Sequence, residues 1–260
     1  DVFFPANLTI ALNGESYAFE EVGVRMKGNT SRREIANQSG SIYSSCHFKI
    51  SLKETFDSPY FQMDEFQSFR HDWGNDWEEK AKREDRSLFG LEKFDLKYIP
   101  RNSSLSTLEE IYCYEAFRCS DIMAPCATYA KVSLSSDTSS SEYYAELIEP
   151  INKDFLKRRL EKKDRGGDLY KCVYSWMGPA DLTRNNAVEK SLDENGNSIG
   201  KRLPQGKIGV EDNVALYHPS YQLKTNDKEG EDSDFSKMER FINSVWSIRY
   251  NKAGQTLLEE

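Results

Sequence analysis

The residues with the clearest chemical potential form a short cationic turn near the start of the chain. Arg25 and Lys27 place two positive charges beside Gly28 and Asn29, which supply the backbone freedom that a tight turn needs. The hydroxyl of Ser31 follows. Positive charge, N–H donors and hydroxyls are together what a phosphate group requires. The alternative interpretation is the basic end of a β-hairpin, because short glycine-rich turns are common.

A second candidate is Lys49, which lies in a segment of alternating polarity. The alternation places Phe48 and Ile50 on one face of a predicted strand and Lys49 on the other. Lys49 therefore points away from the predicted core, in a direction that would suit a cleft. The alternative is a solvated lysine, which is the common case for a lysine on a strand.

The elements that must position these residues are mainly β-strands. The Asn13-Gly14 pair is a strong hairpin signal. Alternation and β-branched or aromatic content predict strands at residues 8–12, 17–19, 22–27, 46–52, 93–99, 129–134, 143–148, 169–174 and 221–224. The segment 178–213 is rich in Gly, Asn, Asp and Pro, which predicts a loop with short elements.

Helices are predicted where apolar residues recur at helical spacing. One opens after a capping region at residues 102–104, a second covers 151–162, and a third begins near residue 234. The predicted inner side of the first is Leu105, Leu108, Ile111, Tyr112, Ala116 and Phe117. The charged run 78–86 is also helix-like. It predicts a solvated helix face, an insertion or a lid.

Composition and charge narrow the class of protein. The chain has 260 residues, a formal net charge of −8 and 12% aromatic residues, which is too aromatic for a disordered chain and argues against bulk nucleic-acid binding. No uninterrupted apolar run approaches the roughly 18 residues of a membrane span. The chain begins at Asp1 without Met, which we interpret as a processed or engineered start.

The five cysteines carry no metal-site spacing. Their number is odd, no CxxC pair occurs, and the three histidines do not complete a zinc pattern. Buried free thiols are the simplest prediction. A bridge between Cys119 and Cys126 stays open for a secreted protein.

Several short motifs, taken in their order along the chain, resemble those of the CotH family of atypical, spore-coat-type protein kinases. The family's R-x-R-G-N-S/T-S loop, K-x-S strand and N-G-x-Y-x-G-x-Y-x-L-x-E hairpin are the most specific of them. The resembling segments are residues 24–31, 48–52, 114–118, 143–149, 155–156 and 167–171. Residues 221–226 show a weaker resemblance. Lys27 stands where the family has arginine, and Ala145 where it has glycine. Lysine keeps the positive charge of arginine but lacks its planar guanidinium group, which can donate two parallel hydrogen bonds.

The resemblance implies an α+β fold: an antiparallel, β-rich, kinase-like N-terminal lobe with packed helices, incomplete at the C-terminus. One CotH-like domain would cover residues 1–260, β-rich over about 1–175 and loop-rich and helical over about 176–260. The family's catalytic and metal-binding aspartates follow the last predicted helix. We therefore expect no catalytic residue and no metal ligand within the chain, and a catalytic half beyond Glu260.

The resemblance also implies ATP and Mg²⁺ as cofactors and a Ser/Thr-rich protein as substrate. In this scheme Glu115 orients Lys49, Glu149 lies in the nucleotide cleft and Lys171 lies on its wall. The residues expected to face the nucleotide are Arg25, Lys27, Asn29, Ser31, Lys49, Glu115, Glu149 and Lys171.

A second function class stays open. Tyr-rich strands and a negative net charge also suit a non-catalytic binding or adhesion module of a surface or cell wall, or a spore-coat-like structural protein. Neither class predicts nucleic-acid binding or a membrane span. The residues do not fix a compartment; the resemblance favours a bacterial protein at the cell surface, secreted or associated with spores.

Overall fold

The computed structural model separates the chain into two compact units, Asp1–Ile151 and Asn152–Glu260. The structure describes residues 2–28, 46–99, 106–136, 139–173, 180–182, 188–192, 198–202, 220–226 and 235–249.

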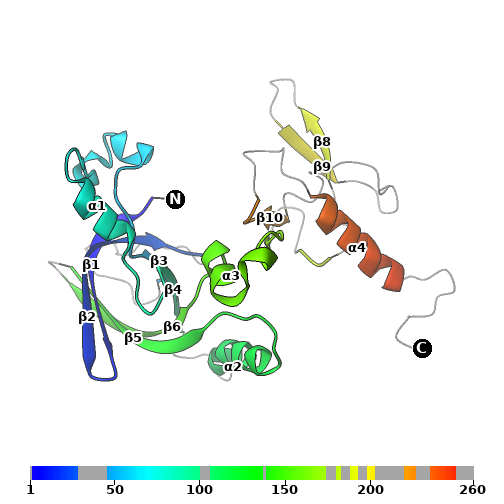
Figure 1. Cartoon of the computed structure of the whole chain (residues 1–260), viewed down its shortest axis with the longest axis horizontal. Helices are drawn as coiled ribbons and strands as arrows, with labels where there is room; N and C mark the ends of the chain where they lie inside the picture. The colour runs from blue at the N-terminus through cyan, green and yellow to red at the C-terminus, as the bar shows by residue number, and fades with distance from the viewer. Residues whose placement is uncertain are drawn as a thin grey trace. The chain divides into compact units, whose positions relative to one another are not determined.

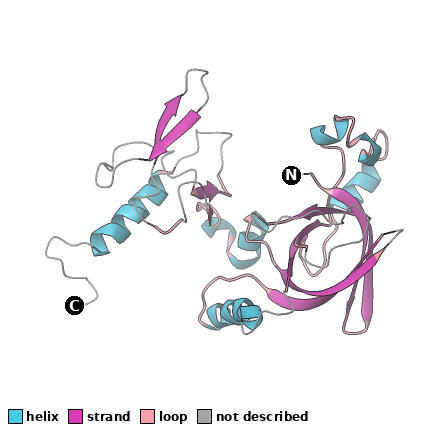
Figure 2. Ribbon diagram, turned by 180° about the vertical axis from the view of Figure 1, so that it is seen from behind, coloured by secondary structure: helices cyan, strands magenta, loops and turns pink. Residues whose placement is uncertain are grey.

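The first unit is built on one curled antiparallel sheet (Figures 1 and 2). Its strands are β1 (Phe4–Leu12), β2 (Glu15–Met26), β3 (Phe48–Ser51), β4 (Lys93–Tyr98), β5 (Ala127–Ser135) and β6 (Ser140–Ile148). They lie in the order β1-β2-β3-β4-β6-β5, and every neighbouring pair is antiparallel. This sheet and its helices confirm the predicted α+β, antiparallel, β-rich class.

The β1–β2 hairpin forms where its turn residues predict it. Asn13 and Gly14 take φ values of 52° and 84°, the left-handed conformation that a two-residue hairpin of this kind needs. A bulge interrupts the pairing between Ala6 and Leu8. There Asn7 Oδ1 accepts a hydrogen bond of 3.1 Å from the N–H of Glu21.

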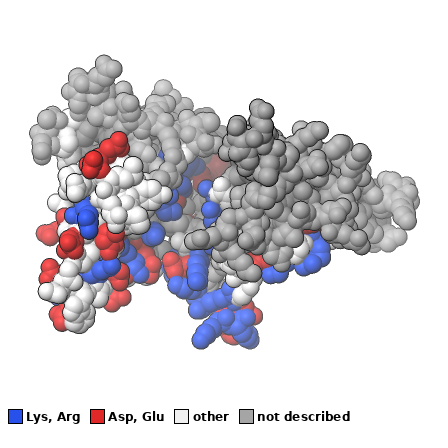
Figure 3. Space-filling model, turned by 90° about the horizontal axis from the view of Figure 1, so that it is seen from above, with Lys and Arg blue, Asp and Glu red and all other residues white. Residues whose placement is uncertain are grey.

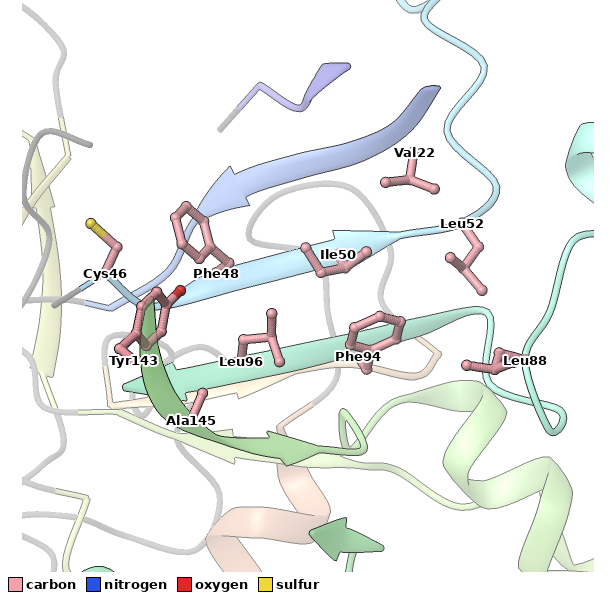
Figure 4. Close-up of a cluster of buried hydrophobic side chains, with 10 residues drawn as sticks. All are labelled: Val22, Cys46, Phe48, Ile50, Leu52, Leu88, Phe94, Leu96, Tyr143 and Ala145. Carbon is pink, nitrogen blue, oxygen red and sulfur yellow. The ribbon is translucent and has the colours of Figure 1, made fainter. Parts of the chain in front are cut away.

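The hydrophobic core lies inside the curl of the sheet. Side chains from both edge strands, Leu8 on β1 and Val132 on β5, pack against the same buried cluster. Figure 4 shows its buried members gathered on one side of β3, β4 and β6. They are Val22, Cys46, Phe48, Ile50, Leu52, Leu88, Phe94, Leu96, Tyr143 and Ala145. Full burial of each large member contributes roughly 1.5–3 kcal/mol.

Between β3 and β4 the chain forms a helical insertion. It contains the short helices η1 (Pro59–Gln62) and η2 (Gln67–Phe69) and the helix α1 (Trp77–Glu84). The charged run predicted as a solvated face is therefore helical over most of its length, and one of its residues is buried. Arg83 is 7% exposed, because its guanidinium lies 5.1 Å from the ring centroid of Trp73 and 2.7 Å from Glu21 Oε2.

The helix α2 (Ser106–Cys119) lies outside the curl, next to β5 and β6 (Figures 1 and 2). The expected inner side is wrong for Tyr112 and Phe117, which are 74% and 46% exposed, whereas Ile111 is half-buried as expected. Glu110 and Tyr114 are half-buried as well, because the sheet surface beneath them is charged rather than apolar. The predicted capping region at residues 102–104 is outside the described residues.

The second unit has its own small core. Its elements are α3 (Lys153–Arg159), η3 (Lys162–Asp164), β7 (Tyr170–Cys172), β8 (Val188–Leu192), β9 (Ser198–Arg202), β10 (Tyr221–Leu223) and α4 (Ser236–Arg249). Antiparallel pairs form between β7 and β10 and between β8 and β9. Tyr221, Leu223, Phe235, Met238 and Ile242 make the buried cluster. The helix predicted over 151–162 is shorter, since α3 ends at Arg159.

The cysteines are free thiols, and only one is buried. Cys46 belongs to the core of the first unit, whereas Cys113, Cys119, Cys126 and Cys172 are exposed. The prediction of buried thiols is therefore correct for Cys46 alone. Among the helices of the described residues, none has the length and apolar character that crossing a membrane requires.

Candidate functional site

The strongest concentration of charge on the sheet lies on its outer face, opposite the core. Pairing places Arg25 of β2 beside Lys49 of β3, and Lys49 beside Asp95 of β4. Further along the same face, Lys97 of β4 lies opposite Glu146 of β6. Strand alternation therefore separates the apolar core and this charged face cleanly.

Asp95 is the centre of the charged face. The carboxylate is almost fully buried, at 4% exposure. The Nζ of Lys27 donates to its Oδ2, and the Nζ of Lys49 lies 4.0 Å from its Oδ1. Oδ1 itself is buried without a hydrogen bond from the described residues. A buried carboxylate in this state is costly unless positive charge surrounds it.

Several cations act on Lys49 beside Asp95. Burial lowers the pKa of Lys49, Asp95 opposes this effect, and repulsion from Arg25, Lys27 and Lys93 lowers that pKa further. Three other cations thus act on Lys49 beside Asp95. Their positive charge makes the surface attractive to an anion with several negative oxygens.

A second ion-pair network adjoins this group. Lys97 contacts Glu110 of α2, and its Nζ lies 3.5 Å from Oε2 of Glu146, which is 3% exposed. The hydroxyl of Tyr114 donates to Glu110 over 2.8 Å. Burial, and then the charge of Glu146, raise the pKa of Tyr114. Lys97 therefore joins α2 to the outer face of the sheet.

The structure brings together three of the residues expected to face a nucleotide. Arg25, Lys27 and Lys49 lie on the outer face around Asp95. The guanidinium of Arg25 lies 5.3 Å from the ring centroid of Phe3, which holds it against the sheet. Two other expected residues, at positions 29 and 31, lie outside the described residues.

Two expected glutamates are placed elsewhere. Glu115 is exposed and lies 3.3 Å from Arg118 on the same helix, whereas Asp95 is the carboxylate beside Lys49. Glu149 is 1% exposed. Its Oε2 accepts from the N–H of Cys126 over 2.9 Å, and its own N–H donates to the Cys126 carbonyl. Glu149 thus fixes the chain just before β5.

Lys171 belongs to the second unit, where it is exposed on β7 opposite Gln222 of β10. This pairing unites two of the motifs that resemble the CotH family, because residues 167–171 and 221–226 form one structure. Asn226 donates to Asp168 over 2.7 Å, and Lys237 of α4 lies 2.7 Å from the same carboxylate.

Sequence reasoning missed the carboxylates and the lysine that complete the charged face. Asp95 and Lys97 lie in a segment predicted as a strand, and their alternation with Phe94 and Leu96 was the available signal. Glu146 is harder to find, because its place beside Lys97 depends on β6 pairing with β4 across a helix and a strand.

Comparisons with protein-family models, with curated proteins and with solved structures give no match for this chain. Within the described residues, no group of three or more His, Cys, Asp or Glu side chains could hold a metal ion.

Proposed function

We propose that the outer face of the six-stranded sheet binds the phosphate groups of a nucleotide, in the manner of the N-terminal lobe of an ATP-dependent atypical protein kinase such as those of the CotH family. The observation that carries the proposal is the cluster of cations around Lys49 and Asp95. Lys27 and Lys49 lie at the carboxylate, and Arg25 and Lys93 act on Lys49 from the neighbouring strands.

This arrangement suits phosphate for an electrostatic reason. Arg25, Lys27 and Lys93 repel Lys49, and the burial of Lys49 makes this repulsion stronger than it would be in water. A bound triphosphate would offset the repulsion and supply acceptors for the ammonium and guanidinium groups. The lysines would hold the phosphates by charge, and Arg25 would add a planar pair of donors.

The contact between Lys97 and Glu110 supports a kinase-type lobe in particular. Protein kinases hold a nucleotide with a strand lysine that is fixed by a glutamate from the following helix. Lys97 lies on β4, and Glu110 lies on α2, the next α-helix in the chain. We therefore assign this role to Lys97 and Glu110 rather than to Lys49 and Glu115.

Magnesium, when bound with the nucleotide, would screen the phosphate charge. Mg²⁺ sites on nucleotides use one or two carboxylates together with the phosphates. Asp95 is the carboxylate at the cationic group, and Lys27 already occupies its Oδ2. Asp95 is therefore poorly placed to hold Mg²⁺, and the resemblance to the CotH family implies a Ser/Thr-rich protein as the phosphate acceptor.

A second function, the binding of a carbohydrate at a surface, is favoured by exposed tyrosines. Tyr129 and Tyr144 are 43% and 62% exposed and lie on the same face of β5 and β6. Glu146 lies opposite Tyr129. Flat aromatic rings beside a carboxylate suit the apolar face and the hydroxyls of a sugar.

Thermal unfolding with and without ligands tests the proposal. ATP with Mg²⁺, and inorganic tripolyphosphate alone, are each expected to raise the melting temperature by a few degrees at about 100 times their dissociation constant. Lys49→Gln is expected to abolish most of this shift. Lys82→Gln, which removes an exposed lysine on α1, is the matched control and should leave the shift unchanged.

Two results would contradict the phosphate proposal. One is the absence of any shift with millimolar tripolyphosphate or ATP. The other is a shift with soluble oligosaccharides that disappears in Tyr144→Ala and persists in Lys49→Gln, which would favour the carbohydrate-binding function instead.

A further inference from the structure

A row of apolar side chains lies on the helical insertion between β3 and β4. Three successive turns share their end residues there. The N–H of Met63 donates to the Tyr60 carbonyl at 3.2 Å, and the N–H of Phe66 donates to the Met63 carbonyl at 2.9 Å. The third bond joins Phe69 to Phe66 at 3.0 Å. Because the Cα atoms at the two ends of such a turn lie within about 7 Å, the four residues are neighbours in space. They are here called the apolar row: Tyr60, Met63, Phe66 and Phe69.

The two halves of the apolar row differ in exposure. Phe66 and Phe69 are half-buried, because both rings pack edge-on against Phe4, with centroid distances of 6.0 and 5.7 Å. Tyr60 and Met63 are 55% and 51% exposed. Apolar side chains that stay exposed beside other apolar groups are typical of surfaces that bind a partner. Tyrosine and methionine are also enriched at the centres of protein interfaces.

The backbone beneath the exposed half of the row is held in place. Phe61 of η1 is 1% exposed and packs against the buried ring of Phe56 at a centroid distance of 5.6 Å. The carbonyl of Phe56 accepts from the N–H of His71 at 3.1 Å. Pro59 at the start of η1 restricts the backbone further. A partner therefore loses little affinity to the ordering of this segment.

The apolar row lies in an acidic part of the chain. Residues 54–86 contain ten Asp and Glu against five Lys and Arg, a net charge of −5. Asp64 and Glu65 are the central residues of the turn from Met63 to Phe66. Both are exposed, and neither forms an ion pair with the described residues. Figure 3, in which the first unit lies at the left, shows Asp and Glu side chains beside uncharged surface.

The cations of the insertion do not neutralise the exposed half of the row. Four of the five have acceptors elsewhere: Lys80, Lys82, Arg83 and Arg86 contact Asp57, Glu79, Glu21 and the carbonyl of Glu20, respectively. The fifth, Arg70, follows Phe69 at the half-buried end of the row. A partner that reaches Tyr60 and Met63 therefore meets negative charge first.

This charge disfavours three possible occupants of the apolar row. DNA and RNA carry a negative charge on every phosphate, and anionic membranes carry a negative surface potential. A second copy of the chain, bound through the same surface, would bring two acidic surfaces together. A partner with positive charge does not meet this repulsion.

A neutral lipid layer is disfavoured by the position of the carboxylates. Asp64 and Glu65 lie between members of the row, so entry of the row into lipid would remove both from water. Trp77, at the start of α1, is exposed as well, and it is bordered by Asp76 and Glu78. The insertion therefore exposes apolar groups only beside carboxylates.

We propose that the apolar row binds a segment of a protein partner that combines apolar side chains with Lys or Arg. The apolar side chains of the segment would pack on Tyr60 and Met63. Its cations would pair with Asp64 and Glu65 or lie over the ring of Tyr60. This binding does not depend on the phosphate site of the outer face.

Fluorescence anisotropy of a labelled peptide of repeated Leu-Lys-Gly, about twelve residues long, tests this on the full chain. We expect saturable binding to the wild type. The double variant Tyr60→Ser, Met63→Ser should bind at least about tenfold more weakly, because the exposed apolar contacts are lost. The double variant Asp64→Asn, Glu65→Gln should bind at least about threefold more weakly in about 0.05 M salt, and this difference should shrink in about 0.5 M salt.

Each double variant has a matched control on or next to α2. Tyr112→Ser, Met123→Ser removes a tyrosine and a methionine that are 74% and 53% exposed. Glu109→Gln, Asp121→Asn removes two exposed carboxylates. We expect both controls to bind the peptide within about twofold of the wild type, because these residues are not part of the insertion. Melting curves verify that all variants are folded.

Several results would overturn the proposal. One is no binding of the peptide, and another is an equal loss in the matched controls, which would indicate adsorption to any apolar or acidic surface. A third is equal binding of a peptide with Gln in place of Lys, which would remove the selection by charge. The last is binding of soluble oligosaccharides or phosphatidylcholine vesicles, or self-association in ultracentrifugation, that is lost in Tyr60→Ser, Met63→Ser. That result would assign the apolar row to a sugar, a lipid or a second copy instead.

Discussion

The inner and outer faces of the six-stranded sheet are made from alternate residues of the same strands. On β4, Phe94 and Leu96 face the core, whereas Asp95 and Lys97 face outward. The inner face is stabilised by apolar burial, which needs no partner. The outer face contains buried carboxylates among lysines. Burial removes water from these charged groups, and an added anion can stabilise the lysines. Fold stability and ligand binding should therefore respond to substitutions on different faces.

The largest expected difference between the faces is in stability. Phe94→Ala removes a core ring that is 2% exposed and should lower the free energy of unfolding by about 3–5 kcal/mol. Tyr144→Ala, on the outer face at 62% exposure, should change it by less than about 0.5 kcal/mol. Urea unfolding measures both changes in free energy. Equal losses of stability in the two variants would contradict the proposed difference between the inner and outer faces.

The outer face is closely packed at one point, Gly23. A Cβ at this position would lie 2.7 Å from the Cβ of Glu54 and 3.1 Å from that of Phe3. Gly23→Ala should therefore destabilise the protein by about 1–3 kcal/mol. Gly166→Ala, where a Cβ meets nothing within 4 Å, is the control and should stay within about 0.5 kcal/mol. A harmless Gly23→Ala would show that Glu54 moves aside.

The inner face of the sheet contains a buried polar group, the hydroxyl of Tyr143, which tests whether apolar burial alone stabilises this face. The hydroxyl of Tyr143 is buried and makes no hydrogen bond within the described residues, and burial raises its pKa. Tyr143→Phe should be neutral or stabilising by up to about 1 kcal/mol. Tyr221→Phe should instead destabilise by about 1 kcal/mol, because the Tyr221 hydroxyl accepts from the Leu182 N–H over 2.8 Å. Thermal melts distinguish the pair, and a destabilised Tyr143→Phe would refute this account.

The smallest expected effect concerns Glu21, which links β2 to the helical insertion. Arg83, and to a lesser extent His71, lower the pKa of Glu21 below its usual 4.5. Its carboxylate therefore stabilises the fold at pH above 4.5, and this contribution disappears as the pH falls through the lowered value. Glu21→Gln should cost about 0.5–1 kcal/mol at pH 7 and nothing near pH 2. If the difference in unfolding free energy between the wild type and Glu21→Gln stays constant with pH, the proposed role of this charge is contradicted.

Local patterns predicted the fold class and the strands that carry the cations. The alternation around Lys49 correctly separated Phe48 and Ile50 from the charged side, and Asn13-Gly14 gave the hairpin. These features depend on neighbours in sequence, so one stretch of residues suffices to find them.

Features that depend on long-range pairing could not be predicted. The partner of Lys49 is Asp95, forty-six positions later, and Glu146 reaches Lys97 only because β6 adds beside β4. Arg83 was assigned to a solvated face, whereas Trp73 and Glu21 bury it. A single sequence does not give the strand order that creates these contacts.

Calorimetric titration with inorganic tripolyphosphate tests the central claim, that the outer face is a cationic phosphate site restrained by Asp95. The experiment compares the wild type with Lys49→Gln and Asp95→Asn, and melting curves establish that each variant is folded. We predict opposite effects, at least about fivefold weaker binding for Lys49→Gln and at least about fivefold tighter binding for Asp95→Asn, because one removes a cation and the other its counter-charge. Weaker binding in both variants, or no change in either, would contradict the account.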